Sequence, residues 1–144
     1  MGMDHEKLVN GDAYTTDRGK LILRRPAPHV VVLIATGYGG KDLAAPILAL
    51  RDMVVQQAGK IALFDDFEKA TGYDSELRVK LTDWSRRNAK AMTSHHILTS
   101  SKLVAMGVAV ANLALGATIK AHTSRRAFEE ALRLEIDPRP FSRR

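Results

Sequence analysis

Hydrophobic residues along this chain form short runs and helix-spaced stripes in alternation, a pattern typical of an α/β domain. Residues 30–34 are five consecutive apolar side chains between Pro28 and Gly37, and they predict a strand over 29–36 that is buried on both faces. Apolar side chains then recur at helical spacing from Leu43 to Val54 and predict a helix that Gly59 ends. The other expected elements are strands at 13–16, 20–24, 60–64, 94–99 and 118–122 and helices that begin near 75, 103 and 125, with loops at 37–40 and 65–73.

The order of these elements defines the expected fold class. Three strands followed by alternating helices and strands predict an α/β fold with a mixed, mainly parallel sheet, an N-terminal antiparallel hairpin and about four helices. We expect one domain over residues 11–134, a flexible N-terminus at 1–10 and a basic C-terminal tail at 135–144. The chain has no cysteine, no apolar leader at its start and no apolar run long enough to span a bilayer, so we expect a cytoplasmic protein.

The charge balance narrows the class of partner. Lysine and arginine outnumber aspartate and glutamate by 22 to 16, which gives a formal net charge of +6. The arginines come in scattered pairs with acidic residues between them, an arrangement typical of a solvated surface. No recognition-helix, zinc-finger or RNA-binding pattern accompanies them, so we do not expect a nucleic-acid partner.

The candidate catalytic and cofactor motifs all lack a required residue. The glycine-rich segment 37–40 resembles a phosphate loop, but Ala35 and Asp42 stand where that loop needs glycine and a hydroxyl. Asp65, Asp66 and Glu68 follow a predicted strand and lack a histidine at metal-ligand spacing. The sequence therefore predicts no enzyme, no cofactor and no metal site.

The segment 103–115 is apolar on every side of its predicted helix. A helix of this kind is buried, contacts a partner or enters lipid. Three interpretations stay open: a core helix that also forms a homodimer face, a wall of an apolar ligand pocket, and a membrane-surface contact. The residues that would form the dimer or ligand face are Leu103, Met106, Val110 and Leu113.

The segment from Asp66 to Ser75 carries a resemblance to a known family. A buried strand ends in Asp65-Asp66, and Asp74-Ser75 opens a helix about eight residues later. Together with the order of elements over residues 12–134, this resembles the STAS (anti-sigma-factor-antagonist) fold and its SpoIIAA-like branch of uncharacterised bacterial proteins. In the antagonists two serines follow the aspartate and the second is phosphorylated, whereas Glu76 stands at that second position here. The resemblance implies a partner-binding surface, or a phosphorylation switch at Ser75, formed by Asp66, Asp74, Ser75 and Glu76.

These observations give one main hypothesis of function and two alternatives. The main hypothesis is a non-catalytic regulatory module that binds another protein, whose identity the sequence does not give. The first alternative is a carrier or sensor of an apolar ligand or lipid, with the helix 103–115 lining its pocket. The second alternative is an enzyme that uses Asp65, Asp66 and Glu68 with a metal ion.

Overall fold

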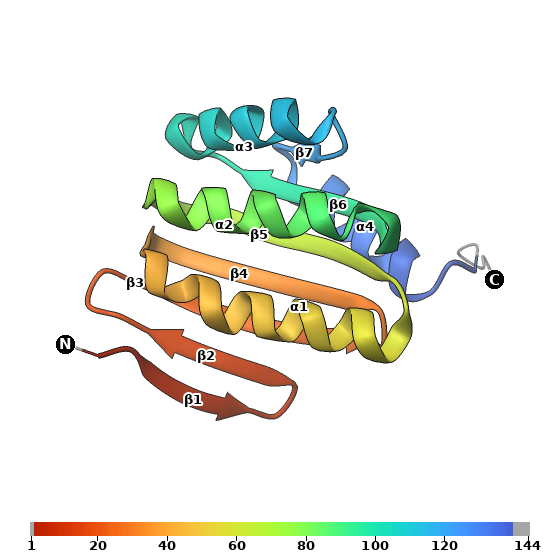
Figure 1. The fold of residues 1–144 in the computed structure, drawn as a ribbon, viewed down its shortest axis with the longest axis horizontal. Coiled ribbons are helices and arrows are strands. Elements are labelled where there is room, and N and C mark those ends of the chain that lie inside the picture. The colour runs from red at the N-terminus through yellow and green to blue at the C-terminus, as the bar shows by residue number, and fades with distance from the viewer. Residues whose placement is uncertain (1, 140–144) are drawn as a thin grey trace.

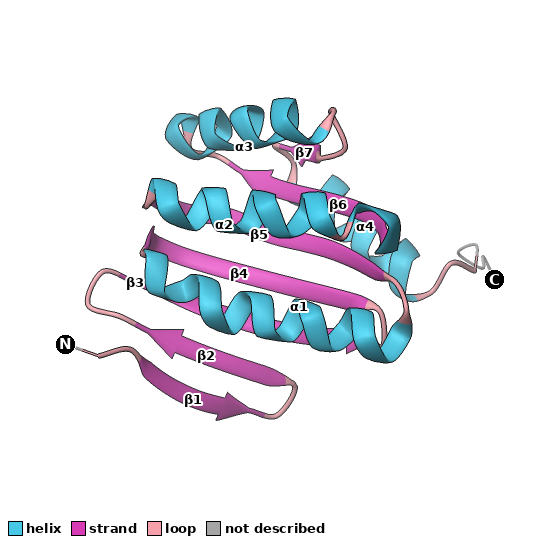
Figure 2. Cartoon of the chain, in the orientation of Figure 1, coloured by secondary structure: helices cyan, strands magenta, loops and turns pink. Residues whose placement is uncertain are grey.

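The computed structural model describes residues 2–139 as a seven-stranded mixed sheet with helices on both faces, as Figures 1 and 2 show. The strands lie in the sheet in the order in which they occur along the chain. The strands are β1 (Asp4–Leu8), β2 (Gly11–Thr15), β3 (Gly19–Ala27), β4 (Val30–Gly39), β5 (Ile61–Tyr73), β6 (Met92–Thr99) and β7 (Lys120–His122). The helices are η1 (Lys41–Leu43), α1 (Ala44–Ala58), α2 (Ser75–Arg87), η2 (Ala89–Ala91), α3 (Lys102–Leu115) and α4 (Arg125–Ile136).

The direction of each strand pair follows from what connects the strands. Short turns join β1 to β4, and these strands pair antiparallel. Segments that contain helices join β4 to β7, and these strands pair parallel. The predicted fold class, a mainly parallel sheet with an antiparallel start, is therefore confirmed in its architecture, with a longer antiparallel part than the single hairpin expected.

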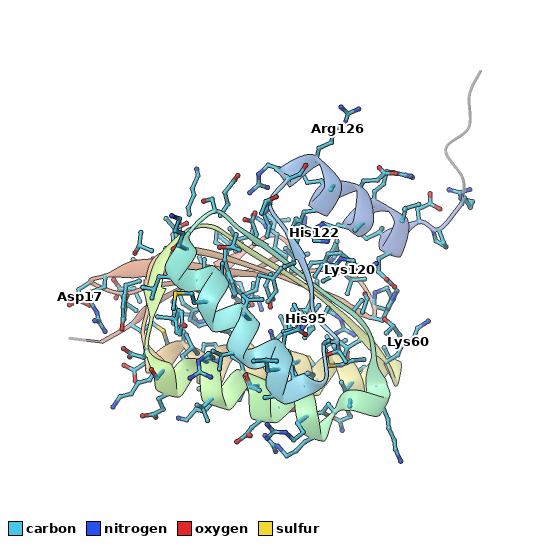
Figure 3. All side chains as sticks on the ribbon, turned by 90° about the horizontal axis from the view of Figure 1, so that it is seen from above. Asp17, Lys60, His95, Lys120, His122 and Arg126 are labelled. Carbon is cyan, nitrogen blue, oxygen red and sulfur yellow. The ribbon has the colours of Figure 1, made fainter. Side chains whose placement is uncertain are left out.

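The two faces of the sheet carry different cores. On one face, α1, α2 and α3 pack against the strands through three clusters of buried apolar side chains. On the other face, α4 packs alone, with Phe128 against Phe64 and Val32. Figure 3 shows the same division from above: α4 lies on one side of the sheet and the other three long helices lie on the opposite side. Residues that alternate along β5 therefore point into two different environments.

Capping residues mark the ends of α1 and α3 and the starts of α3 and α4. Gly59 and Gly116 follow α1 and α3 in the left-handed region, at φ 74° and 75°. The hydroxyls of Ser101 and Ser124 accept hydrogen bonds from backbone N–H groups in the first turns of α3 and α4. The starts of α3 and α4 thus follow directly from serine caps in the sequence.

Two expectations about the chain are wrong. Residues 4–8 form the edge strand β1, where the sequence predicts a flexible N-terminus. Their charged side chains hide the strand pattern, and charges on an edge strand protect it from pairing with other chains. Residues 65–73 continue strand β5, where the sequence predicts a loop, because the polar stretch pairs with the second half of β4. Residues 140–144 of the expected basic tail lie outside the described residues.

The length and hydrophobicity of the helices decide whether one of them could cross a membrane. Within residues 2–139, no helix combines the length and the apolar character that crossing a bilayer requires.

Candidate functional site

The first candidate site surrounds Asp74, where β5 ends and α2 begins. The Asp74 carboxylate accepts a hydrogen bond from the Tyr38 hydroxyl at 2.7 Å and one from the Lys41 backbone N–H at 2.8 Å. These two hydrogen bonds lower the pKa of Asp74, so the group stays ionised at neutral pH. The side chain therefore joins the loop after β4 to the start of α2, although its sequence position suggests only a cap for α2.

Tyr38 and Arg18 complete the surroundings of Asp74. The guanidinium carbon of Arg18 lies 4.2 Å from the centre of the Tyr38 ring, in a cation–π contact. The hydrogen bond to Asp74 raises the pKa of the Tyr38 phenol. The phenol therefore remains a hydrogen-bond donor at physiological pH, and the three side chains hold one another in place.

Ser75 and Glu76 lie beside this group and are both exposed on the first turn of α2. The Glu76 carboxylate lies 3.1 Å from the ammonium of Lys80, one turn along the helix. The predicted residues Asp74, Ser75 and Glu76 thus share one surface. We call the surface formed by Arg18, Tyr38, Asp74, Ser75 and Glu76 the Asp74 surface.

Asp66 does not belong to the Asp74 surface, which corrects the sequence prediction. It lies within strand β5, and its side chain is on the α4 face of the sheet. Its carboxylate binds the guanidinium of Arg125 at 2.8 Å, and Glu68 contacts the same guanidinium at 2.8 Å. These carboxylates raise the pKa of Arg125 and fix the start of α4 against the sheet. The prediction is wrong because β5 continues past Asp66 to Tyr73.

The same alternation along β5 separates the three carboxylates that the metal-enzyme hypothesis joins. Asp65 lies on the face covered by α1 to α3, opposite to Asp66 and Glu68. Among residues 2–139, no group of three or more histidine or acidic side chains has a geometry suited to a metal ion. The carboxylates serve as partners of arginines on two different faces.

Helix α3 presents the predicted apolar residues to the outside of the molecule. Leu103, Met106, Val110 and Leu113 are exposed by 53%, 66%, 49% and 85%, respectively. The opposite side of the helix packs on the sheet through Val104, Gly107, Val108 and Ala111. Both sides of α3 are thus apolar, and the four predicted residues form an outward stripe.

A second candidate site is buried beneath the helices and consists of three titratable side chains. Arg51 of α1, Asp65 of β5 and His95 of β6 are exposed by only 1%, 2% and 7%. His95 Nε2 lies 2.8 Å from one Asp65 carboxylate oxygen, and Arg51 Nη2 lies 3.6 Å from the other. Burial raises the pKa of Asp65, but His95 and Arg51 outweigh it, so the net pKa is lowered and the group is ionised. We call these three residues the buried triad.

Several polar atoms of the buried triad have no hydrogen-bond partner among the described residues. They are Arg51 Nε, Arg51 Nη1, Asp65 Oδ1 and His95 Nδ1. Buried polar groups in folded proteins are nearly always paired, because an unpaired one costs about 1–3 kcal/mol. Four such atoms in one cluster therefore mark a place where water or a polar ligand would supply the missing hydrogen bonds.

The triad lines a cavity of about 110 Å³ between the sheet and helices α1, α2 and α3. Apolar side chains supply most of the wall, and its polar residues include Lys20, Thr36, Arg78, Thr82, Ser85 and the triad. Tyr38 and Tyr73 also line the cavity, so its wall reaches the Asp74 surface. The apolar lining includes Leu33, Leu43, Ile47, Phe67, Leu77, Leu81, Ile97, Val104, Val108, Ala111, Leu115 and Ile119.

Sequence reasoning misses the buried triad for a specific reason in each residue. Arg51 stands four residues after Ile47 and three before Val54, which is an inward position on α1 occupied by a charge. A charged side chain at an inward helical position indicates a buried charge, and this could have been noticed in the sequence. His95 and His96 point to opposite faces of β6, as strand alternation predicts, but the sequence does not reveal that His95 meets Asp65. Asp65 itself lies in the segment that was predicted to be a loop.

His96 forms a second histidine contact on the α4 face. Its Nδ1 lies 2.9 Å from His122 Nε2, and its ring stacks on Phe64 with 4.7 Å between ring centres. Burial, followed by the nearby His122 and Lys120, lowers the pKa of His96 to about 4. His96 is therefore neutral at pH 7, and Figure 3 places its partner His122 on the side of the sheet where α4 lies.

Comparison with known proteins identifies the fold. No family model matches the sequence, and no curated protein matches it. A solved structure is similar over 91% of this chain and 92% of its own, with a TM-score of 0.56 and 12% sequence identity. It is an uncharacterised protein of the DUF3478 family from Shewanella loihica PV-4, described as having a SpoIIAA-like fold. The chain has a SpoIIAA-like fold. The fold that the sequence resemblance implies is thus confirmed.

Proposed function

We propose that this protein is a non-catalytic regulatory module that binds another protein through the Asp74 surface. The proposal is supported by the SpoIIAA-like fold. The observation that carries it is the fixed Asp74 carboxylate, held by Tyr38 and by the Lys41 backbone while Ser75 and Glu76 remain exposed beside it.

This geometry favours binding because the surface is ordered before a partner arrives. Binding loses free energy when mobile side chains must be fixed, by about 0.5–1.5 kcal/mol for each. The hydrogen bonds of Asp74 and the Arg18–Tyr38 contact fix three side chains in advance. A partner then meets a surface whose shape and charges are already set.

The carboxylates of Asp74 and Glu76 give this surface its negative charge. Glu76 places a permanent carboxylate in the first turn of α2, where the helix dipole stabilises negative charge. A phosphate on Ser75 would gain the same stabilisation, while Asp74 and Glu76 would repel it. We therefore propose that Glu76 makes the surface constitutively acidic, and that binding does not require phosphorylation of Ser75.

The test compares two charge reversals on the same helix region. Asp74→Lys removes the acceptor of the Tyr38 and Lys41 hydrogen bonds and reverses its charge, whereas Asp83→Lys reverses an exposed charge near the far end of α2. Tagged wild-type protein and both variants are used to capture partners from cells of the source organism. Circular dichroism first checks that both variants fold.

We expect at least one protein that binds the wild type and Asp83→Lys and is lost with Asp74→Lys. If all three baits retain the same proteins, the Asp74 surface is not the binding site. A Ser75→Ala variant should retain the partner, and its loss would show that Ser75 or its modification is required.

A further inference from the structure

We infer that the cavity between the sheet and helices α1 to α3 is a binding site for a small amphipathic carboxylate, with its acid group at the buried triad and its apolar chain along α3. This inference is independent of the protein-binding surface proposed above. It concerns different residues, apart from Tyr38, which belongs to both.

The first support is the pair of unsatisfied donors on Arg51. The Nε and Nη1 atoms of this guanidinium have no acceptor among the described residues, although the side chain is 99% buried. A buried guanidinium needs hydrogen-bond acceptors, and carboxylates are its most favourable partners. Asp65 meets this need only partly, because it approaches one Arg51 nitrogen at 3.6 Å and binds His95 more closely.

The second support is the balance of charge around the cavity. Lys20, Arg51 and Arg78 are among its lining residues, and Asp65 is the one acidic residue among the lining that the structure describes. Asp65 contacts both His95 and Arg51, and no second acidic residue of the described lining balances Lys20 and Arg78. The excess of basic groups in the lining favours an anionic ligand. His95 Nδ1 also lacks a hydrogen-bond partner among the described residues.

The third support is the size and composition of the wall. An apolar cavity of about 150 Å³ accommodates a benzene ring in another protein, so the 110 Å³ here suits a chain of a few carbon atoms. The wall beyond the triad includes Val104, Val108 and Ala111 from α3 and Ile97 from β6. Ala111, a small residue on the inner side of α3, lines this part of the cavity.

The experiment uses the full-length protein and straight-chain carboxylates from butanoate to decanoate as probes. Isothermal titration calorimetry gives the dissociation constants, and the ¹H–¹⁵N spectrum follows the Arg51 Nε–H resonance. 1-Hexanol serves as a probe with the same chain as hexanoate but without the charge.

Two alanine substitutions on α3 form a matched pair. Ala111→Leu adds three carbon atoms to the cavity wall, whereas Ala109→Leu adds the same atoms on the exposed side of the helix. Hexanoate should bind the wild type and Ala109→Leu equally, and Ala111→Leu at least about tenfold more weakly, because the cavity is filled. Equal binding by all three proteins would overturn the assignment of the site.

Arg51→Met tests the head group separately. It removes the donors and keeps an apolar side chain of similar length, so we expect hexanoate to bind about tenfold more weakly while 1-hexanol changes less than about threefold. Melting temperatures measured with and without hexanoate provide a second readout if Arg51→Met is destabilised. The proposal is overturned if no chain length binds the wild type, or if 1-hexanol binds it as tightly as hexanoate.

Discussion

Breaking the buried pair of Arg51 and Asp65 from one side should destabilise the protein far more than removing both residues together. Asp65→Leu leaves the Arg51 guanidinium buried without an acidic partner in its cluster, which costs about 3–5 kcal/mol. Arg51→Met leaves Asp65 still bound to His95 at 2.8 Å, so the loss is smaller, about 1–3 kcal/mol. The double variant replaces both charges by apolar side chains in an apolar surrounding.

The double variant is expected to lie within about 2 kcal/mol of the wild type, because apolar residues often replace a buried ion pair without loss of stability. His95 then loses its acceptor. The two single losses sum to about 4–8 kcal/mol, so the coupling free energy is at least about 2 kcal/mol. A domain of ordinary stability has only about 5–15 kcal/mol in total, so the effect is readily measured.

Urea denaturation followed by tryptophan fluorescence measures these free energies. Trp84 is the single tryptophan, is 1% exposed, and its ring centre lies 5.4 Å from the Arg51 guanidinium carbon. Because the Arg51 substitution also changes the surroundings of Trp84, far-ultraviolet circular dichroism provides an independent second signal. Free energies of the two single variants that add to that of the double variant, within about 0.5 kcal/mol, would refute the reasoning.

Two further predictions concern His96 and Gly107. The pKa of His96 is about 4 in the folded protein and about 6.5 in the unfolded chain, so the unfolded state binds the proton first as pH falls, and the free energy of unfolding declines between pH 6.5 and 4 by roughly 2–3 kcal/mol. Urea titrations across this pH range should show a flatter decline in His96→Phe and the full decline in His5→Gln. An unchanged slope in His96→Phe would contradict the assignment. In an exposed helix a Gly→Ala substitution stabilises by about 1 kcal/mol, but Gly107→Ala should destabilise the protein by about 1–3 kcal/mol, because the added Cβ would lie against the Tyr73 ring and hydroxyl. Thermal unfolding should show that Gly107→Ala no longer lowers the melting temperature when Tyr73→Ala is also present. Equal losses with and without Tyr73→Ala would exclude the clash.

Much of the fold follows from apolar runs and capping residues. The run at 30–34 becomes β4, and the serine and glycine caps set the bounds of α3 and the start of α4. The N-terminal strand and the second half of β5 do not follow, because their side chains are polar. The acidic side chains of β5 pair with Arg51, His95 and Arg125, which come from other elements, and single-sequence patterns contain no information on such pairing.

The candidate site shows the same division between local and long-range information. Asp74, Ser75 and Glu76 are adjacent in sequence, so one turn of helix keeps them together. Asp66 was grouped with them on the assumption of a short strand, and one extended β5 separates them onto different surfaces. The buried triad comes from three elements spread over 45 positions, and only Arg51 leaves a trace, as a charge on an inward helical position.

Tyr38 connects the two proposed sites physically. Its ring lines the cavity, and its hydroxyl donates the hydrogen bond that holds Asp74. A ligand that moves this ring would alter the Asp74 surface, and a partner that fixes Asp74 would fix one wall of the cavity. Because such coupling is reciprocal, a carboxylate that strengthens partner binding must itself bind more tightly in the complex, by the same factor. If both sites are occupied as proposed, Tyr38 provides a path of one side chain between them.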